Sequence, residues 1–227
     1  AWPPRREVRR HHNSPPHETF RVAGVETGES LEEFVERSQD YQARLLEFAV
    51  HAYRRAKGKV VGYFQFMFVE PWEGITWAVL DVERVPKKGF FALKEASSPV
   101  LLSLVPYLER VEAGAPPLQA AWLVSDLDRP LSLRVRLRLE GPATLLLHEE
   151  EIALDAGEVR RFFSLGELWE SPLEVQARFL PLREALARIP PGAYRLVGEA
   201  WEGERLWSRH VLSVEYLEPI LPLEVAW

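Results

Sequence analysis

A carboxylate and two indole side chains follow an apolar run at residues 63–69: Glu70, then Trp72 and Trp77. Indole faces stack on the C–H groups of sugar rings, while a polar partner fixes the orientation of the ring. Glu70 could accept a hydrogen bond from a sugar hydroxyl or position an arginine or a water. A buried strand that ends in such residues is typical of the rim of a barrel, where functional groups gather. The plainer alternatives are indoles packed against a neighbouring helix and a surface ion pair for Glu70.

Two other groups of residues invite a chemical interpretation. His11-His12, followed by Asn13, could suggest a metal site, but adjacent residues rarely ligate one ion, so we favour a structural role for this pair. The run Glu149–Glu151 could suggest acid–base chemistry. Consecutive residues of a strand point to opposite faces, so we expect a solvated turn there instead.

The elements that would position Glu70 and the two tryptophans are a helix, a strand and a second helix. A capping box at residues 30–33 starts the first helix, and apolar residues at helical spacing continue to a stop signal at residues 57–58. The almost unbroken apolar run 63–69 predicts a strand buried on both faces. Residues 86–97 predict the second helix. This order is one α/β unit, and one unit cannot close a barrel.

From residue 99 onwards the apolar pattern changes to strict alternation. The sequence LSLRVRLRL is typical of a half-buried antiparallel strand. A series of short strands separated by turn residues predicts an all-β immunoglobulin-like sandwich, with a short helix at Pro181–Ile189. The expected strands are Val100–Leu108, Gln119–Val124, Leu131–Leu139, Ala143–Leu147, Glu158–Phe163, Leu173–Leu180, Ala193–Trp201 and Leu206–Glu215.

The composition narrows the class of protein. The 227 residues carry a net charge of −6, so we expect neither nucleic acid nor a membrane surface as a partner. The chain has no Cys, which excludes disulfides and thiolate metal sites and fits a reducing, cytoplasmic location. The absence of Cys, the single Met and the excess of Arg over Lys favour a thermophilic source. A GC-rich genome would equally explain the excess of Arg.

Several short motifs, in order and without a gap, resemble the end of the catalytic barrel of family 2 glycoside hydrolases, nearest to the β-mannosidase branch. The stretch Trp122–Leu131 resembles the start of the β-sandwich that follows this barrel. The matching residues of the barrel part are Ser38-Gln39, Gln42-Ala43, Arg54, Gly62, Phe64, Trp72, Thr76-Trp77, Asp81, Pro86-Lys87, Gly89–Phe91, Leu93-Lys94, Ala96 and Pro99.

The resemblance implies a division of the chain and a role for each part. Residues 1–98 would be the C-terminal part of a (β/α)8 catalytic barrel of the TIM type, and residues 99–227 an immunoglobulin-like sandwich. The complete enzyme would hydrolyse terminal β-linked sugars with retention and without a cofactor or metal. In it, Trp72, Glu70, Phe66 and Trp77 would face the carbohydrate substrate.

The departures from the family pattern concern the same loop. Phe66-Met67 stands where the family has Trp-Gln, Val69-Glu70 where it has Asn-Asp, and Glu73 where it has Pro. Retaining glycosidases need two carboxyl groups about 5 Å apart. The resemblance places both catalytic glutamates upstream of Ala1, so we expect none of the residues of this chain to be catalytic.

These observations leave three interpretations of the chain. The first is the C-terminal part of a β-mannosidase-like enzyme, completed by the remainder of the barrel in the same chain or in a companion chain. The second is a non-catalytic sandwich module that binds a partner chain or a carbohydrate. The third is a remnant of a split or degraded enzyme. In the second case the run 63–69 should be buried within this chain.

Overall fold

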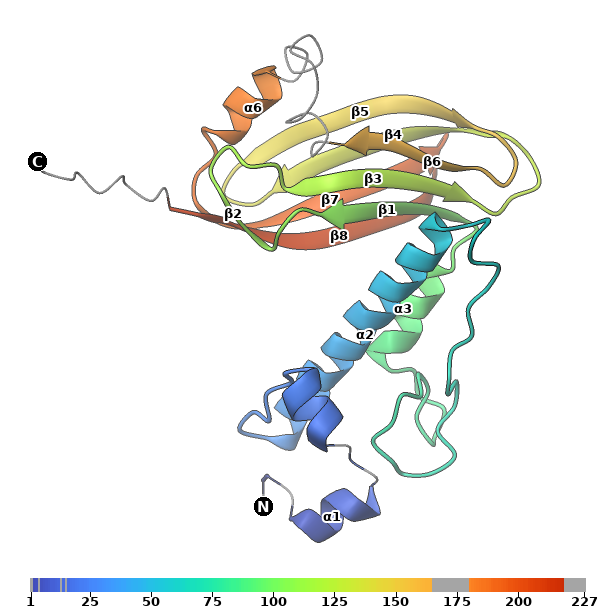
Figure 1. Cartoon of the computed structure of the whole chain (residues 1–227), viewed down its shortest axis with the longest axis vertical. Helices are drawn as coiled ribbons and strands as arrows, with labels where there is room; N and C mark the ends of the chain where they lie inside the picture. The colour runs from blue at the N-terminus through green and yellow to red at the C-terminus, as the bar shows by residue number, and fades with distance from the viewer. Residues whose placement is uncertain (1, 4, 13, 15, 165–179, 219–227) are drawn as a thin grey trace, which may run out of the picture. The chain divides into compact units, whose positions relative to one another are not determined.

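A computed structural model describes residues 2–3, 5–12, 14, 16–164 and 180–218. The chain divides into two compact units, Ala1–Ser97 and Ser98–Trp227, and each is described by itself. The first unit is helical and the second is a β-sandwich (Figure 1). No helix in the described part of the chain combines the length and the apolar character needed to cross a bilayer.

Helices dominate the first unit. Helix α2 (Leu31–Arg55) begins where the capping box predicted it, because the backbone N–H of Glu33 donates to Ser30 Oγ at 3.1 Å. Helix α3 (Lys88–Ala96) packs along α2 and confirms the second predicted helix (Figure 1). Two shorter elements precede them: α1 (Arg6–His11) and the π-helix η1 (His17–Val22).

The predicted strand at residues 63–69 does not form among the described residues. Residues 56–87 make only isolated bridges, one of which joins Val69 to Leu80. Phe64 is 98% exposed and Phe66 is 73% exposed. A strand needs a hydrogen-bonded neighbour, and the described part of this unit offers residues 61–67 none. The prediction of a strand buried on both faces was therefore wrong for the described residues.

The second unit contains two sheets packed face to face. The three-stranded sheet has the order β1 (Val100–Pro106), β3 (Leu118–Ser125), β6 (Val159–Ser164). The five-stranded sheet has the order β2 (Arg110–Glu112), β8 (Arg205–Leu217), β7 (Gly192–Glu202), β4 (Leu131–Glu140), β5 (Thr144–Leu154). The predicted β-sandwich is thus confirmed (Figure 1).

The core of the sandwich lies between the two sheets. Leu133, Val135 and Leu137 of β4 are fully buried, and they belong to one core cluster with Leu102 of β1 and Leu123 of β3. The alternation of β4 read from the sequence therefore corresponds to one buried and one solvated face. This core belongs to the second unit alone.

Three expectations for the sandwich need correction or completion. The predicted strand Ala143–Leu147 runs on to Leu154, so Glu149–Glu151 lies inside β5 and the expectation of a turn was wrong. The helix expected at Pro181–Ile189 is α6 (Leu180–Leu186). The strand expected at Leu173–Leu180 lies outside the described residues except for Leu180, which begins α6.

The outer face of the five-stranded sheet explains why the acidic run stays in a strand. Arg136 lies opposite Glu149, and Arg134 lies opposite Glu151, in the register of β4 and β5. Arg136 Nη2 and Glu149 Oε1 are 2.7 Å apart. Opposite charges placed directly across a sheet stabilise the pairing of its strands.

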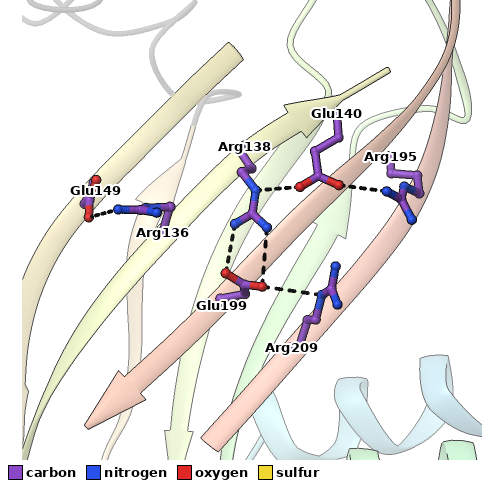
Figure 2. A network of polar contacts seen from close by, with 7 residues as sticks. All are labelled: Arg136, Arg138, Glu140, Glu149, Arg195, Glu199 and Arg209. Atoms are coloured by element: carbon purple, nitrogen blue, oxygen red, sulfur yellow. Dashed lines mark hydrogen bonds and ion pairs between the residues drawn. The ribbon is translucent and has the colours of Figure 1, made fainter. Parts of the chain in front are cut away.

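The same face carries a second, larger group of ion pairs, centred on Arg138. Its guanidinium contacts Glu140 at 2.6 Å and Glu199 at 2.8 Å, and Arg195 and Arg209 extend the group (Figure 2). The hydrogen bond from Arg138 lowers the pKa of the Glu199 carboxyl group. We call the seven residues of Figure 2 the charged face: Arg136, Arg138, Glu140, Glu149, Arg195, Glu199 and Arg209.

Candidate functional site

Residues 70–78, which we call the aromatic loop, contain three of the four residues expected to contact a carbohydrate. The loop starts at Glu70, whose backbone N–H donates to the carbonyl of Leu80 at 3.0 Å. The Thr76 hydroxyl donates to the Glu70 carboxylate and accepts the Ala78 N–H at 3.3 Å. The buried Glu70 side chain and the Thr76 hydroxyl therefore join the start of the loop to its end.

The Glu70 carboxylate is only 4% exposed in this unit. A buried carboxylate is stable only when hydrogen bonds or opposite charges compensate for its lost hydration. Thr76 supplies a hydrogen bond and Lys87 a nearby positive charge. Burial lowers the pKa of the Lys87 ammonium group, while the charges of Glu70 and Asp81 oppose that shift. Glu70 thus holds the loop in place.

The two indoles of the loop point outward. Trp72 is 53% exposed and Trp77 is 58% exposed. The indole N–H of Trp72 donates to the carbonyl of His11 at 3.3 Å. The carbonyl of Trp77 accepts side-chain amide hydrogen bonds from Gln42 at 2.9 Å and from Gln65 at 3.0 Å. Both rings keep surface available for a stacking partner, while their backbones are fixed.

Phe66 is the fourth predicted residue, and it lies ahead of the loop on the unpaired segment. It belongs to an exposed apolar row with Val61, Phe64 and Phe68, which are 101%, 98% and 49% exposed. We call these four residues the open strand. Exposed apolar patches of this kind mark interaction sites in soluble proteins.

Sequence reasoning missed several residues that position the loop. Gln42 had been noted only as part of a motif; its role is to hold the Trp77 carbonyl. Gln39 Oε1 accepts the N–H of Lys88 at 3.0 Å and so caps α3. Thr76 also appeared only as part of a motif, and Gln65 carried no signal, since the partners of both side chains are set by tertiary structure.

His11 and His12, for which a structural role was favoured, contact the aromatic loop. The N–H of Ile75 donates to the carbonyl of His12 at 2.7 Å, and the His12 ring bonds to the carbonyl of Glu73. Within each unit taken alone, the described residues bring no three acidic or histidine side chains close enough to share a metal ion. Asn13 lies outside the described residues.

The chain is similar in sequence to fungal β-mannosidases. It is 27% identical over 128 residues to a β-mannosidase B of Aspergillus niger, a match that covers 53% of this chain and 15% of the relative. It is 26% identical over 140 residues to a β-mannosidase B of Emericella nidulans, covering 58% of this chain and 17% of that relative. The chain therefore spans a small part of the length of these relatives. No family model matches it.

Solved structures of glycosidases share the fold of this chain. A β-D-mannosidase from Dictyoglomus thermophilum matches with a TM-score of 0.67 at 12% identity, over 90% of this chain and 23% of that one. An exo-chitosanase from Amycolatopsis orientalis matches with a TM-score of 0.59 at 12% identity, over 86% of this chain and 21% of that one. At such identity the likeness concerns the fold alone. Together with the sequence matches, it confirms the resemblance to β-mannosidases.

Proposed function

We propose that this chain is the C-terminal part of a retaining β-glycosidase of family 2, closest in activity to β-mannosidases. Residues 1–98 supply the last α/β unit of a TIM-type barrel, and residues 99–227 form an immunoglobulin-like sandwich. The complete enzyme hydrolyses terminal β-linked sugars, with β-mannosides as the first choice of substrate, in the cytoplasm. The sequence matches to two β-mannosidases support this assignment.

The observation that carries the proposal is the open strand. This apolar segment leaves Phe64 98% exposed and joins no ladder among the described residues, yet it has the composition of a strand buried on both faces. In a barrel, such a strand is paired on both sides and covered by helices such as α2 and α3. On this proposal, α2 and α3 belong to the outer ring of the barrel, and residues 63–69 become a strand of its inner ring in the complete enzyme.

The position of the aromatic loop at the end of this strand supports the assignment of the substrate site. Functional groups of barrel enzymes lie at the carboxyl ends of the strands. In the complete enzyme, Trp72 provides a stacking surface for the terminal sugar, and Trp77 and Phe66 line the same rim. Glu70 is buried and serves the sugar site by keeping the loop in shape through Thr76.

The reaction itself requires groups from outside this chain. A retaining mechanism uses one carboxyl group as acid and base and a second as nucleophile, about 5 Å apart. The resemblance places these on two other strands of the barrel. The residues of this chain bind and orient the sugar, exclude water from one side of it and keep the aromatic wall fixed during both steps.

The alternative of a non-catalytic sandwich module predicts that the run 63–69 is buried within this chain. The exposure of Phe64 and Phe66 weighs against it. The self-contained core of the sandwich is compatible with either proposal, because a module needs its own core whether or not a barrel precedes it.

The test is the natural protein, captured from its cells with an antibody against the sandwich. We expect an intact mass well above 26.1 kDa, or a tightly bound companion chain, and hydrolysis of an aryl β-mannoside. The purified 227-residue chain should not hydrolyse aryl β-mannoside, β-glucoside or β-galactoside. Turnover by this chain alone that disappears in Glu70→Gln would overturn the proposal.

A further inference from the structure

The end of helix α1 is attached to the aromatic loop at two points. The carbonyl of His12 accepts the Ile75 N–H at 2.7 Å, and the carbonyl of His11 accepts the indole N–H of Trp72 at 3.3 Å. The His11 ring also meets the Trp72 indole edge-on, with centroids 5.4 Å apart. All these residues belong to the first unit, and Trp72 lies 61 positions from His11 in sequence.

A third attachment comes from a side chain. Nδ1 of His12 forms a hydrogen bond with the carbonyl oxygen of Glu73. A carbonyl oxygen only accepts, so the ring nitrogen is the donor and carries the proton at Nδ1. The hydrogen bond therefore fixes the tautomer of a neutral His12 ring, and a protonated ring would keep the same donor.

The hydrogen bonds described for residues 71–75 run almost entirely to this pair of histidines. The one other bond is the Gly74 N–H to the Trp72 carbonyl, which lies within the loop itself. Glu70 and Thr76 anchor the two ends of the loop, but they do not reach its middle. The position of Trp72 is thus determined from outside the loop by His11 and His12.

We propose that His11 and His12 are positioning residues for Trp72, and that α1 forms a supporting wall behind the sugar-stacking indole. The proposal rests on the proposed function, since it assigns the held indole to a sugar. Trp72 keeps 53% of its surface exposed while one edge is occupied by His11. The ring is therefore held on one side and free to stack on another.

The chemistry of stacking explains why such support matters. A planar ring contributes to binding only when its face is parallel to the sugar and close to it. A displacement of about 1 Å in a positioned group can cost up to about 100-fold in rate. A loop tethered only at its ends would leave the indole free to turn, and the histidine pair removes that freedom before the substrate arrives.

The test uses two substitutions of His12 in the complete enzyme. His12→Ala removes the bond to the Glu73 carbonyl, while His12→Asn keeps a donor, since the side-chain amide of Asn lies near the place of Nδ1. We expect kcat/KM for an aryl β-mannoside to fall about tenfold or more in His12→Ala, with an unchanged melting temperature, and to recover in His12→Asn. His17→Ala, an exposed histidine of η1, is the matched control.

A second measurement keeps this inference separable from the proposed function. In the 227-residue chain, hydrogen exchange of the peptide that covers residues 71–77 should be faster in His12→Ala than in the wild type or His12→Asn. Equal exchange and equal kcat/KM in wild type and His12→Ala would overturn the role of the histidines but would leave the proposed function standing. A complete wild-type enzyme without glycosidase activity would overturn the proposed function, and with it the sugar assigned to Trp72.

Discussion

The side-chain amide of Gln42 donates to the carbonyl oxygen of Trp77 at 2.9 Å, which fixes the end of the aromatic loop to helix α2. This contact requires a glycine on the neighbouring helix. A Cβ atom at Gly89 of α3 would lie 2.6 Å from Gln42 Oε1 and 3.2 Å from its Cγ. The two helices approach closely at this point because position 89 has no side chain.

Gly89→Ala should therefore displace the Gln42 amide. The lost hydrogen bond costs about 0.5–1.5 kcal/mol, and the better helix propensity of Ala returns up to about 1 kcal/mol, so the free energy of unfolding should change little. In a Gln42→Ala background, where the obstacle is gone, the same substitution should stabilise the chain by about 0.5–1 kcal/mol. Urea unfolding of the four variants measures this coupling.

Gly62→Ala is the control for this cycle, because nothing lies within 4 Å of a Cβ at that position. It should show no coupling to Gln42→Ala. Additive effects of the Gly89 and Gln42 substitutions would show that the two side chains do not compete for space.

Trp72→Ala in the complete enzyme should reduce kcat/KM for an aryl β-mannoside, by on the order of 1–3 kcal/mol of transition-state stabilisation. The melting temperature should change little, because the ring is half-exposed and removing it leaves no closed cavity. Kinetics and thermal unfolding of this one variant distinguish a sugar-stacking Trp72 from one that packs in the core. A large drop in melting temperature with unchanged kinetics would assign Trp72 to the core, where large-to-small substitutions cost roughly 3–5 kcal/mol.

A fragment of residues 98–227 should fold cooperatively as a monomer, since its core is built from both of its own sheets. A fragment of residues 1–97 should associate, because the open strand leaves apolar side chains in water. Sedimentation and denaturant unfolding of both fragments test this. The reverse behaviour, with a monomeric folded 1–97 and an unfolded 98–227, would contradict our division of the chain.

Gly198→Ala should destabilise the sandwich by roughly 1–3 kcal/mol, because the added methyl group would overpack its core. A Cβ at this position of β7 would lie 2.5 Å from Leu102 Cδ2 and 3.1 Å from a methyl carbon of each of Leu104 and Leu137. Those leucines are fully or almost fully buried and have little room to move. Ser132→Ala on the exposed face of β4 is the control and should be close to neutral in the same urea titration.

Acid should weaken the sandwich partly through Glu202. Hydrogen bonds from Arg129 and from the Trp207 indole lower the pKa of Glu202 to about 2, against an ordinary value of 4.5. A pKa lowered in the folded state adds stability above the unfolded pKa, and this contribution is lost as the pH falls from about 4.5 to about 2. The loss of stability with acid should be shallower in Glu202→Gln than in Glu204→Gln, a matched exposed carboxylate in the same turn.

Local signals in the sequence were enough to predict α2, α3, α6 and most of the sandwich, but not α1 or η1. The capping box at Ser30 and the alternation of β4 each involve neighbours in the chain, so periodicity reveals them. The run Glu149–Glu151 was misjudged because its partners, Arg134 and Arg136, lie on another strand. β2 is only three residues long and pairs with the distant β8, so no local pattern marked it.

The candidate site was predictable in its residue types but not in its supports. Glu70 and the two indoles stood out because they follow an apolar run. The hydrogen bond between the Trp72 indole and the His11 carbonyl joins residues 61 positions apart, and no local pattern in either segment predicts it. The run 63–69 was predicted as a strand from its apolar character. Strand pairing depends on residues far apart in sequence, so no local pattern marked that this run joins no ladder among the described residues.

The charged face of the sandwich also bears on how a larger protein could be assembled. Arg138 and Glu199 are paired with each other and with Glu140 and Arg209, so their charges are already compensated within the sheet. Stripping water from such a network is costly unless the newcomer supplies matching charges. A domain or second copy that docks through an apolar surface should therefore not bind to the charged face. We expect this face of the five-stranded sheet to stay exposed to solvent in a larger assembly.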